Sequence, residues 1–230
     1  MPPGLPANHL SFVIPVLNEQ EVIVPLLKDL RARYPGSELI VVDGGSTDQS
    51  AALARPLCEQ LLSAPAGRAL QMNAGGQSAS GEYVLFLHAD TLPQITSGRL
   101  LDYLAKVPQW GFCRVQLSGT SRVFRVIEWF MNQRSRITQV ATGDQMIFVR
   151  KSVFEQTAGF DAIPLMEDVA YCKRLRQLAP PLVINEPVAT SSRRWEVHGV
   201  VPTVVRMWLL RLAYFIGVSP GTLARHYYDR

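Results

Sequence analysis

The sequence has little cysteine, no long apolar run and little charge. Its 230 residues include three cysteines, Cys58, Cys113 and Cys172, which are scattered and show no metal-binding spacing. This pattern excludes a disulfide framework and a cysteine metal site, and it is typical of a reducing compartment. No stretch approaches the roughly 18 consecutive apolar residues of a membrane-spanning helix. The sequence therefore predicts no membrane-spanning helix.

Charged residues make up 18% of the chain, and the formal net charge is +4. This excess suits an anionic small molecule or an anionic lipid surface, and it is too small to indicate nucleic-acid binding. Residues 1–9 show neither the basic nor the apolar region of a signal peptide, so we expect a short tail and a cytoplasmic protein. Hydrophobic residues make up 47%, which is enough to fill one α/β domain.

The most informative stretch is continuously apolar over residues 83–87 and ends in His88, Ala89 and Asp90. A short run of this kind predicts a strand buried on both faces of a sheet. Ligands of open α/β sheets bind at the carboxyl ends of the strands, so Asp90 is a candidate ligand for Mn²⁺ or Mg²⁺ together with a diphosphate. The alternative is that Asp90 only caps the segment that follows it.

Three further strands are predicted, at 10–16, at 38–43 and, more weakly, at 60–63. Asn18 and Glu19 open a helix that runs to about residue 33, with Pro25 as a candidate kink. Ser46 or Thr47 is the expected cap of the next helix. This alternation of strands and helices predicts an α/β fold with a single, mostly parallel, Rossmann-like sheet flanked by helices.

A helix is predicted at 67–76 and begins with Arg68. An arginine at a helix start opposes the helix dipole, which favours a nearby anion as its partner. An ordinary solvated side chain is the alternative. Glu167 and Asp168 open a later helix that extends to about residue 178, where they are either dipole complements or functional acids.

The predicted helix 122–133 is amphipathic, with its apolar residues on one face. That face comprises Val123, Val126, Ile127, Phe130 and Met131. Further elements are expected at 96–106, 110–117 and 146–149. The run Arg193-Arg194-Trp195 joins two cations to an aromatic ring, a combination that suits a diphosphate and a sugar. A surface loop with one packed tryptophan is the alternative there.

Residues 201–216 form a predicted amphipathic C-terminal helix. Its apolar stripe comprises Val204, Val205, Trp208, Leu209, Leu212, Phe215 and Ile216. We expect this stripe to pack mainly against the protein itself. A homodimer contact and a peripheral membrane contact, at the inner face of the cell membrane, remain as alternatives.

Five motifs now appear in a recognisable order. They are 14–19 (IPVLNE), 41–48 (VVDGGSTD), 73–75 (NAG), 87–90 (LHAD) and 167–168 (ED). In this order they resemble the family 2 glycosyltransferases, which are inverting, metal-dependent enzymes with the GT-A fold. Within that family the motifs at 67–75, 88–91, 141–145 and 164–168 most resemble a bacterial subgroup often labelled arsenosugar-biosynthesis glycosyltransferases.

The resemblance implies a glycosyltransferase domain over residues 10–198. A nucleotide-binding half would span about 10–92, an acceptor-binding half about 93–198, and a C-terminal helix and tail 199–230. It implies a nucleotide-diphospho-sugar donor and a small-molecule or lipid-linked acceptor. The implied nucleotide contacts are Pro15, Asn18, Glu19, Asp43, Arg68, Asn73 and His88.

By the same resemblance, Asp90 binds the metal and Asp168 is the catalytic base, with Glu167 in a supporting role. The implied acceptor and diphosphate contacts are Gly143, Asp144, Gln145, Arg194 and Trp195. Two residues depart from the family pattern. Gly44 replaces a second acid after Asp43, and His88 replaces the first acid of the Asp-x-Asp motif.

Two other enzyme classes fit the residues poorly. A phosphatase of the haloacid dehalogenase type needs a nucleophilic aspartate where His88 stands. A dinucleotide-dependent oxidoreductase needs Gly-x-Gly-x-x-Gly after the first strand, and residues 15–19 lack it. The non-enzymatic alternative is a catalytically degenerate glycosyltransferase-like protein that binds a partner or a membrane. The presence of both Asp90 and Asp168 argues against it.

Overall fold

The computed structural model describes residues 10–228, apart from the side chains of Arg194, Val197, His198 and Tyr228; the expected tail 1–9 lies outside the described residues. In chain order the elements are β1 (Leu10–Val16), α1 (Ile23–Arg33), β2 (Glu38–Asp43), α2 (Ser50–Ala54), η2 (Arg55–Leu57), β3 (Gln60–Ser63), α3 (Arg68–Ser78), β4 (Tyr83–Phe86), β5 (Thr91–Pro93), α4 (Ser97–Leu104), β6 (Trp110–Leu117), α5 (Arg122–Thr138), η3 (Gly143–Gln145), β7 (Ile147–Arg150), α6 (Lys151–Gln156), α7 (Glu167–Leu178), β8 (Leu182–Thr190), α8 (Arg193–His198), α9 (Val200–Phe215) and α10 (Pro220–Tyr228). The predicted α/β alternation is confirmed, whereas β5 and β8 were not anticipated.

All eight strands join one sheet in the order β3-β2-β1-β4-β7-β6-β8-β5. The first four strands of that order are parallel, as the sequence predicts, with Val16 opposite Asp43 and Val13 opposite Phe86. Beyond β4 the sheet is mixed, because β7 runs antiparallel to both β4 and β6. Both expected halves of the domain therefore contribute to a single sheet.

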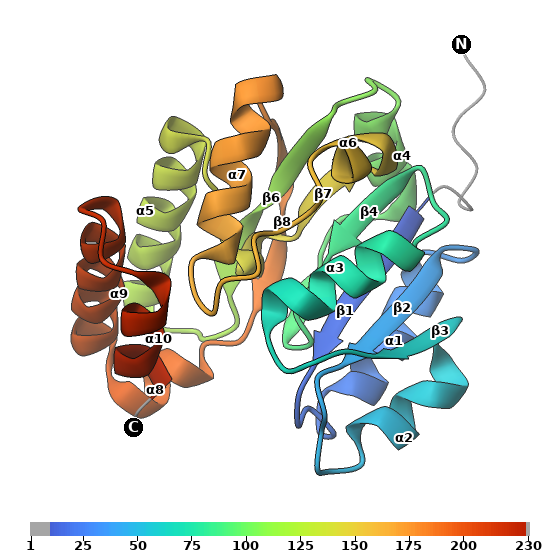
Figure 1. Cartoon of the computed structure of the whole chain (residues 1–230), viewed down its shortest axis with the longest axis horizontal. Coiled ribbons are helices and arrows are strands. Elements are labelled where there is room, and N and C mark those ends of the chain that lie inside the picture. The colour runs from blue at the N-terminus through green and yellow to red at the C-terminus, as the bar shows by residue number, and fades with distance from the viewer. Residues whose placement is uncertain (1–9, 229–230) are drawn as a thin grey trace.

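The core lies on both faces of this sheet. Alternate side chains of a strand point to opposite faces, so Phe12 joins α1 and α4 on one face while Val13 joins α3, α6 and α7 on the other. Figure 1 shows α3, α6 and α7 in front of the sheet. The helices thus cover the faces and leave the edge where β1, β2 and β4 end open to ligands.

Two local expectations in the first loops are wrong. Pro25 lies in the first turn of α1, where the missing N–H is not needed, so it does not interrupt the helix. Neither Ser46 nor Thr47 caps α2, because the cap position is Gln49. Instead Asp48 accepts a hydrogen bond of 2.9 Å from the Ser50 amide at the start of that helix.

Helix α5 is amphipathic, as the sequence predicts, and most of its apolar face is exposed. The side chains of Val123, Val126 and Phe130 are 48%, 55% and 54% exposed. Ile127, on the same face, is buried. Most of the apolar face therefore points away from the protein.

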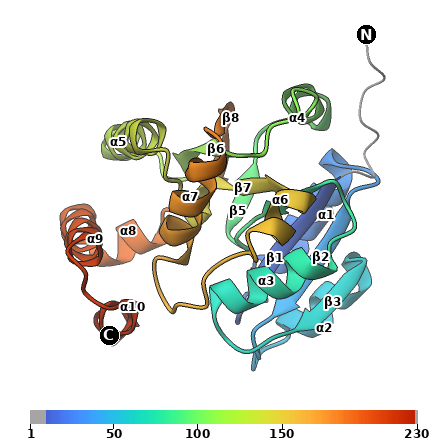
Figure 2. The same ribbon diagram turned by 45° about the horizontal axis from the view of Figure 1, so that its top comes forward.

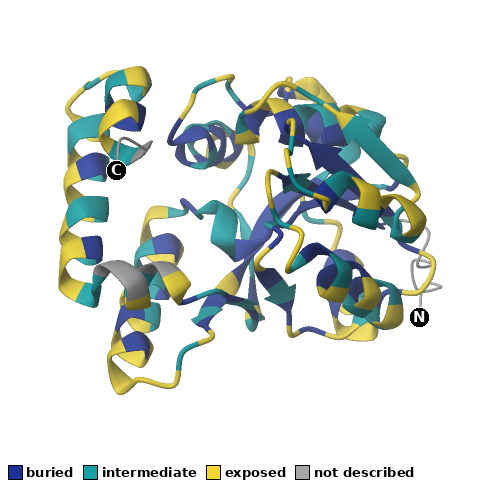
Figure 3. Ribbon diagram, turned by 90° about the horizontal axis from the view of Figure 1, so that it is seen from below, coloured by how far each residue is buried: buried dark blue, intermediate teal, exposed yellow. Residues whose placement is uncertain are grey.

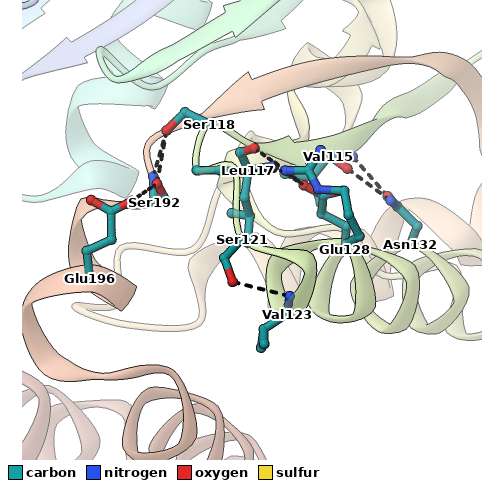
Figure 4. Close-up of polar contacts among 11 residues, drawn as sticks. Val115, Leu117, Ser118, Ser121, Val123, Glu128, Asn132, Ser192 and Glu196 are labelled. Atoms are coloured by element: carbon teal, nitrogen blue, oxygen red, sulfur yellow. Dashed lines mark hydrogen bonds and ion pairs between the residues drawn. The ribbon is translucent and has the colours of Figure 1, made fainter.

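The polar side of α5 faces the sheet because the later part of β6, which pairs with β8 on one side, has no paired strand on its other side. β6 pairs with β7 only near its start. Further along, the Asn132 side chain accepts a hydrogen bond from the Val115 amide and donates one to the Val115 carbonyl, both at 2.9 Å, and Glu128 accepts from the Leu117 amide at 2.6 Å (Figure 4). These bonds satisfy backbone groups whose desolvation would otherwise cost about 1–3 kcal/mol each. They hold the polar face of α5 against β6.

Helix α9 differs from its expectation. Trp208, Leu212 and Phe215 are 67%, 58% and 60% exposed, whereas Thr203 and Leu210 are buried on the opposite side of the helix. Figure 3 shows exposed residues recurring along α9. The expected packing of the stripe against the protein is therefore wrong within the described chain. None of the helices described is long and apolar enough to cross a bilayer.

Candidate active site

The polar residues singled out in the sequence gather at one edge of the sheet. β1, β2 and β4 are parallel neighbours, so the loops 17–19, 44–48 and 87–90 leave the sheet on the same side. β7 is antiparallel to β4, so η3, which precedes β7, reaches the same edge. The amide of Gly143 in η3 donates a hydrogen bond to Asp168, which brings the start of α7 to this edge too.

The first two loops are tied together by hydrogen bonds. The amide of Asn18 donates to Ser46 Oγ at 3.0 Å, and the amide of Thr47 donates to Asn18 Oδ1 at 2.9 Å. The Asp43 carboxylate accepts from the amides of Gly45 and Ser46 at 3.1 and 3.2 Å. Asn18 has a φ of 57°, which asparagine tolerates better than most residues. Asn18 and Asp43 therefore build one rigid wall of the site.

Gln71 of α3 braces the ends of β1 and β2 and explains the glycine at position 44. Its buried Nε2 donates to the carbonyls of Val16 and Val42 at 2.9 and 2.8 Å. A Cβ on Gly44 would lie only 2.9 Å from that Nε2 atom. The missing second acid thus leaves room for a structural brace. Pro15 lies within β1, opposite Val42, and is partly exposed.

Arg68 begins α3, and its side chain is exposed. Burial and the charge of Asp90 raise the pKa of Glu19, while Arg193 and Arg68 lower it in part. The Arg68 charge also opposes the raised pKa values of Glu167 and Asp168. Its guanidinium therefore lies within electrostatic reach of acids from two sides of the site, a position suited to an anionic ligand.

Asn73 is engaged by the protein backbone. Its Nδ2 donates to the Phe160 carbonyl at 2.8 Å, and its Oδ1 accepts from the Phe160 amide at 2.7 Å. The side chain thus anchors the loop 157–166, which leads into α7. Its expected contact with a nucleotide stays a prediction, and the observed bonds show it as the support of a neighbouring loop.

His88 packs directly against Gly143. A Cβ at position 143 would collide with the imidazole ring, so a side chain there would displace one of the two loops. Burial and the charge of Arg68 lower the pKa of His88 to about 3, which keeps the ring neutral at physiological pH. Its buried Nε2 has no hydrogen-bond partner among the described residues.

Asp90 is exposed, and its carboxylate accepts one hydrogen bond, of 3.3 Å, from Thr91 Oγ1. Among the described residues no group of three or more His, Cys, Asp or Glu side chains has the geometry of a metal site. Mg²⁺ commonly takes one or two protein carboxylates and completes its shell with phosphate oxygens and water. Asp90 therefore fits a cation that arrives with a diphosphate better than a resident metal ion.

The two acids at the start of α7 have different surroundings. Glu167 is 5% exposed, and burial together with the neighbouring Asp168 raises its pKa to about 7. Burial also raises the pKa of Asp168. Asp168 accepts hydrogen bonds from the amides of Gly143 at 2.9 Å and Val169 at 2.7 Å, and both lower its pKa in part. Asp168 is thus held in a fixed orientation at the start of α7.

Sequence reasoning gave Arg134 no role, yet its guanidinium is buried beside these acids. Burial lowers the pKa of Arg134, and the charges of Asp144 and Asp168 oppose that shift. Burial raises the pKa of Asp144, which Thr142 and Arg134 lower in part. Arg134 Nε and Asp144 Oδ1 are buried without a hydrogen-bond partner in the part of the chain described. A cation in an amphipathic helix normally faces solvent, so only the packing reveals this cluster.

Three expected acceptor or diphosphate contacts stay predictions: two of the side chains are engaged by the protein, and one lies outside the described residues. Gln145 is buried, accepts a hydrogen bond from Ser135 Oγ at 2.7 Å and orders η3. Trp195 packs against the small core cluster of Leu117, Phe124 and Ile127. The side chain of Arg194 lies outside the described residues, and the neighbouring Arg193 is the cation that acts on Glu19.

Sequence comparison relates this chain to sugar-transferring enzymes. A protein from Serratia proteamaculans, named undecaprenyl-phosphate 4-deoxy-4-formamido-L-arabinose transferase, is 34% identical over 160 residues, covering 61% of this chain and 46% of the relative. A Staphylococcus epidermidis poly-beta-1,6-N-acetyl-D-glucosamine synthase is 32% identical over 90 residues, covering 36% of this chain and 22% of the relative. The chain spans about half the length, or less, of the curated relatives it matches.

Structural comparison supports the expected GT-A-like fold. TarS residues 1–349 from S. aureus, in complex with UDP, match with a TM-score of 0.63 and 17% identity, over 79% of this chain and 60% of that one. The mannosyltransferase PcManGT from Pyrobaculum calidifontis, in complex with GDP-Man and Mn²⁺, matches with a TM-score of 0.61 and 21% identity, over 89% and 61% of the two chains. The sequence profile of glycosyl transferase family 2 matches residues 11–153, more than half of the chain, and the chain therefore belongs to this family.

Proposed function

We propose that the protein transfers a sugar from a nucleoside-diphosphate donor to an acceptor hydroxyl, with inversion at the anomeric carbon. One observation carries the proposal: an exposed cation, Arg68, and an exposed carboxylate, Asp90, share an edge of the sheet with the acid Asp168, whose pKa is raised by burial. The first two suit a diphosphate and the third suits an acceptor. An in-line displacement needs the departing diphosphate and the attacking acceptor on opposite sides of the sugar.

The donor half of the site uses residues that the fold already holds rigid. The wall made by Asn18 and Asp43 would take the nucleoside, and Arg68 would take the diphosphate by charge-assisted hydrogen bonds. Glu19 lies within electrostatic reach of Arg68, Arg193 and Asp90. The two arginines can therefore exchange this partial pairing for pairing with a bound phosphate.

A divalent cation, Mn²⁺ or Mg²⁺, would supply Lewis-acid stabilisation of charge on the departing diphosphate. Asp90 is the residue of this chain that would hold it, with phosphate oxygens and water as further ligands. Arg68 would add a fixed positive charge beside the same phosphates. Preorganised charges of this kind favour the transition state because they need not reorient when the bond breaks.

Asp168 would accept the proton of the acceptor hydroxyl as that oxygen attacks the anomeric carbon. The amides of Gly143 and Val169 hold its carboxylate in place, and burial raises its pKa toward the value of a useful base. A phosphate acceptor, such as the one named for the Serratia relative, is already ionised and needs no base. The buried acids therefore favour a hydroxyl acceptor, on a small molecule or on a lipid-linked sugar.

Turnover of nucleotide sugars tests the proposal. UDP-, GDP- and dTDP-sugars would be incubated with the protein and Mn²⁺, and release of the nucleoside diphosphate would be measured with and without EDTA. Thermal unfolding with the matching nucleoside diphosphates gives a second readout, since ligand at 100 times its Kd adds about 2.7 kcal/mol of stability. Metal-dependent release supports the enzyme.

Binding without turnover in any acceptor mixture would favour the alternative, a degenerate glycosyltransferase-like protein that binds a partner or a membrane. The motifs at 67–75, 88–91, 141–145 and 164–168 support membership of the bacterial subgroup labelled arsenosugar-biosynthesis glycosyltransferases. We place the protein in the cytoplasm, where nucleotide sugars are the available donors, and at the inner face of the cell membrane when it works on a lipid-linked acceptor.

A further inference from the structure

The exposed apolar side chains of this protein are concentrated on two helices. Sixteen large apolar side chains are exposed in the part of the chain described, and twelve of them lie on α5, on α9 or directly after α9. We call these twelve the apolar surface. They are Val123, Val126, Trp129, Phe130, Ile137, Val201, Val205, Trp208, Leu209, Leu212, Phe215 and Ile216. Scattered exposed apolar residues need no explanation, but a concentration of this kind marks an interaction site.

The two helices form one continuous flank of the molecule. Val200 and Val204 at the start of α9 pack against the same small cluster that contains Phe124 and Ile127 of α5. Figures 1 and 2 show α5 and α9 beside each other, on the side of the molecule away from β1, β2 and β3. The exposed stripes of both helices are therefore available to one partner.

The polar faces of the two helices are already in use. Asn132 and Glu128 bind the backbone of β6, as described above, and Arg206 of α9 donates to the Tyr227 carbonyl at 3.1 Å. Turning either helix to bury its apolar stripe would break these bonds. The outward orientation of the apolar surface is thus a property of the fold.

Positive charge is concentrated on the same flank. Helix α5 carries four arginines and one glutamate, and residues 191–228 carry five arginines and one glutamate. The two segments hold an excess of seven positive charges, so the rest of a chain with net charge +4 is negative. Two of these cations, Arg134 and Arg193, act on acids of the site and do not count toward the flank. Arg122 and Arg136 of α5 and Arg225 of α10 are exposed. Aliphatic and aromatic side chains bordered by arginine are the composition of helices that lie in a membrane interface.

We propose that the apolar surface docks on an anionic lipid membrane, with α5 and α9 lying in the interface. A second copy of this chain is the less suitable occupant, because a symmetric contact would set the same excess of positive charge against itself. Anionic headgroups neutralise that excess, at about 1 kcal/mol for each arginine near the surface. The exposed Trp129 and Trp208 suit the headgroup region, where amphipathic rings are favoured.

This docking would bring the acceptor side of the site close to the lipid. Helix α5 contributes the exposed Phe130 to the apolar surface and, four residues later, Arg134, whose charge acts on Asp144 and Asp168. Residues four apart are neighbours on one side of a helix, with Cβ atoms about 5–6 Å apart, so the site would lie close to the headgroups. That distance suits a lipid-linked acceptor, a refinement that rests on the proposed function, whereas the docking itself does not.

Vesicle co-sedimentation tests the docking. The protein, without nucleotide, is mixed with vesicles of phosphatidylcholine alone or with about one third phosphatidylglycerol, at low salt and at roughly 0.5 M NaCl. We expect binding to the anionic vesicles, and at least a tenfold loss at high salt. The double variant Trp208→Glu and Leu212→Glu should lose at least a hundredfold in binding, because it removes two large apolar side chains from the interface and adds two negative charges.

The matched control is Val107→Glu, an exposed apolar residue in the loop after α4, and it should bind as the parent does. Trp129→Glu on α5 is an independent second variant, and circular dichroism checks that each variant folds. Equal binding of parent and variants, or no binding to anionic vesicles, would overturn the proposal. So would a dimer in light scattering that the variant Trp208→Glu dissociates. Nucleoside-diphosphate binding is measured separately, so that a failure of membrane docking can be distinguished from a failure of the proposed function.

Discussion

The amide of Gly143 donates a hydrogen bond of 2.9 Å to the carboxylate of Asp168, across 25 residues of sequence. Gly143 also packs against the ring of His88, so one glycine joins the end of β4 to the start of α7. A side chain at position 143 would collide with the ring of His88 and move the loop after β4 away from η3. Parts of the motifs at 88–91, 141–145 and 164–168 are therefore one structural unit.

Asp168→Asn should reduce sugar transfer by about 10²- to 10⁴-fold, the usual loss when a general base is removed. Nucleotide-sugar affinity should change only a few-fold, because the base contacts the acceptor. Glu167→Gln, the matched variant, should cost less. Steady-state kinetics with a competent acceptor measure both. A larger rate loss for Glu167→Gln would identify Glu167 as the base.

Stability should depend on pH through Glu167. Its pKa is raised from 4.5 to about 7 in the folded protein, so between these values the unfolded chain loses its proton first. The free energy of unfolding therefore falls as pH rises through this window, and this group alone contributes a loss on the order of 1–3 kcal/mol. Glu167→Gln should flatten the dependence of the free energy of unfolding on pH. Compared with the parent protein at the same pH, the variant should be more stable at pH 8 than it is at pH 4.5. Urea unfolding at several pH values from 4.5 to 8 measures this dependence. If the variant shows the same dependence as the parent protein, Glu167 is not its cause.

Asp90→Asn should abolish the metal dependence of nucleoside-diphosphate binding without unfolding the protein. The side chain is exposed and makes one weak hydrogen bond, so little stability depends on its charge. Calorimetric titration with UDP or GDP, with and without Mn²⁺, measures the effect. If affinity and metal dependence match those of the parent protein, Asp90 is only a capping residue.

Arg68→Gln should weaken nucleoside-diphosphate binding by roughly 10- to 100-fold, since a hydrogen bond to a charged group contributes about 1.5–3 kcal/mol. Arg114→Gln on β6 is the matched control, because Arg114 is also exposed and lies on another strand. Titration with the same nucleotide compares the two. Equal affinities for both variants would remove Arg68 from the donor site.

Gln71→Leu should destabilise the fold by about 2–4 kcal/mol. The substitution removes the Nε2 donor from the carbonyls of Val16 and Val42. The Val16 carbonyl keeps the bond from the Gly44 amide, so the larger cost, about 1–3 kcal/mol, falls on Val42, and a smaller loss at Val16 adds to it. For a protein of this size that corresponds to a fall in Tm of roughly 4–16 °C. Differential scanning calorimetry measures the shift. A Tm within about 1 °C of the parent would show that water replaces the amide.

The sequence by itself determined the strands that carry the site. Short apolar runs ending in polar residues identified β1, β2 and β4 because strands buried on both faces have no other composition. Since parallel strands end at a common edge, the same pattern brought Asp43, Asp90 and the first loop together. The order of the motifs added the family, which the match over residues 11–153 confirms.

Only the tertiary structure decided which faces of the helices are buried. The apolar stripe of α9 predicted packing against the protein and is instead exposed. On α5 the polar side satisfies the backbone of β6, so that side faces inward. Periodicity identifies a face but not its partner. Arg134, in an ordinary polar segment, and Asn73, within a recognised motif, likewise acquired their surroundings from segments distant in sequence. A side chain's burial and hydrogen bonds depend on such distant neighbours, which local composition does not encode.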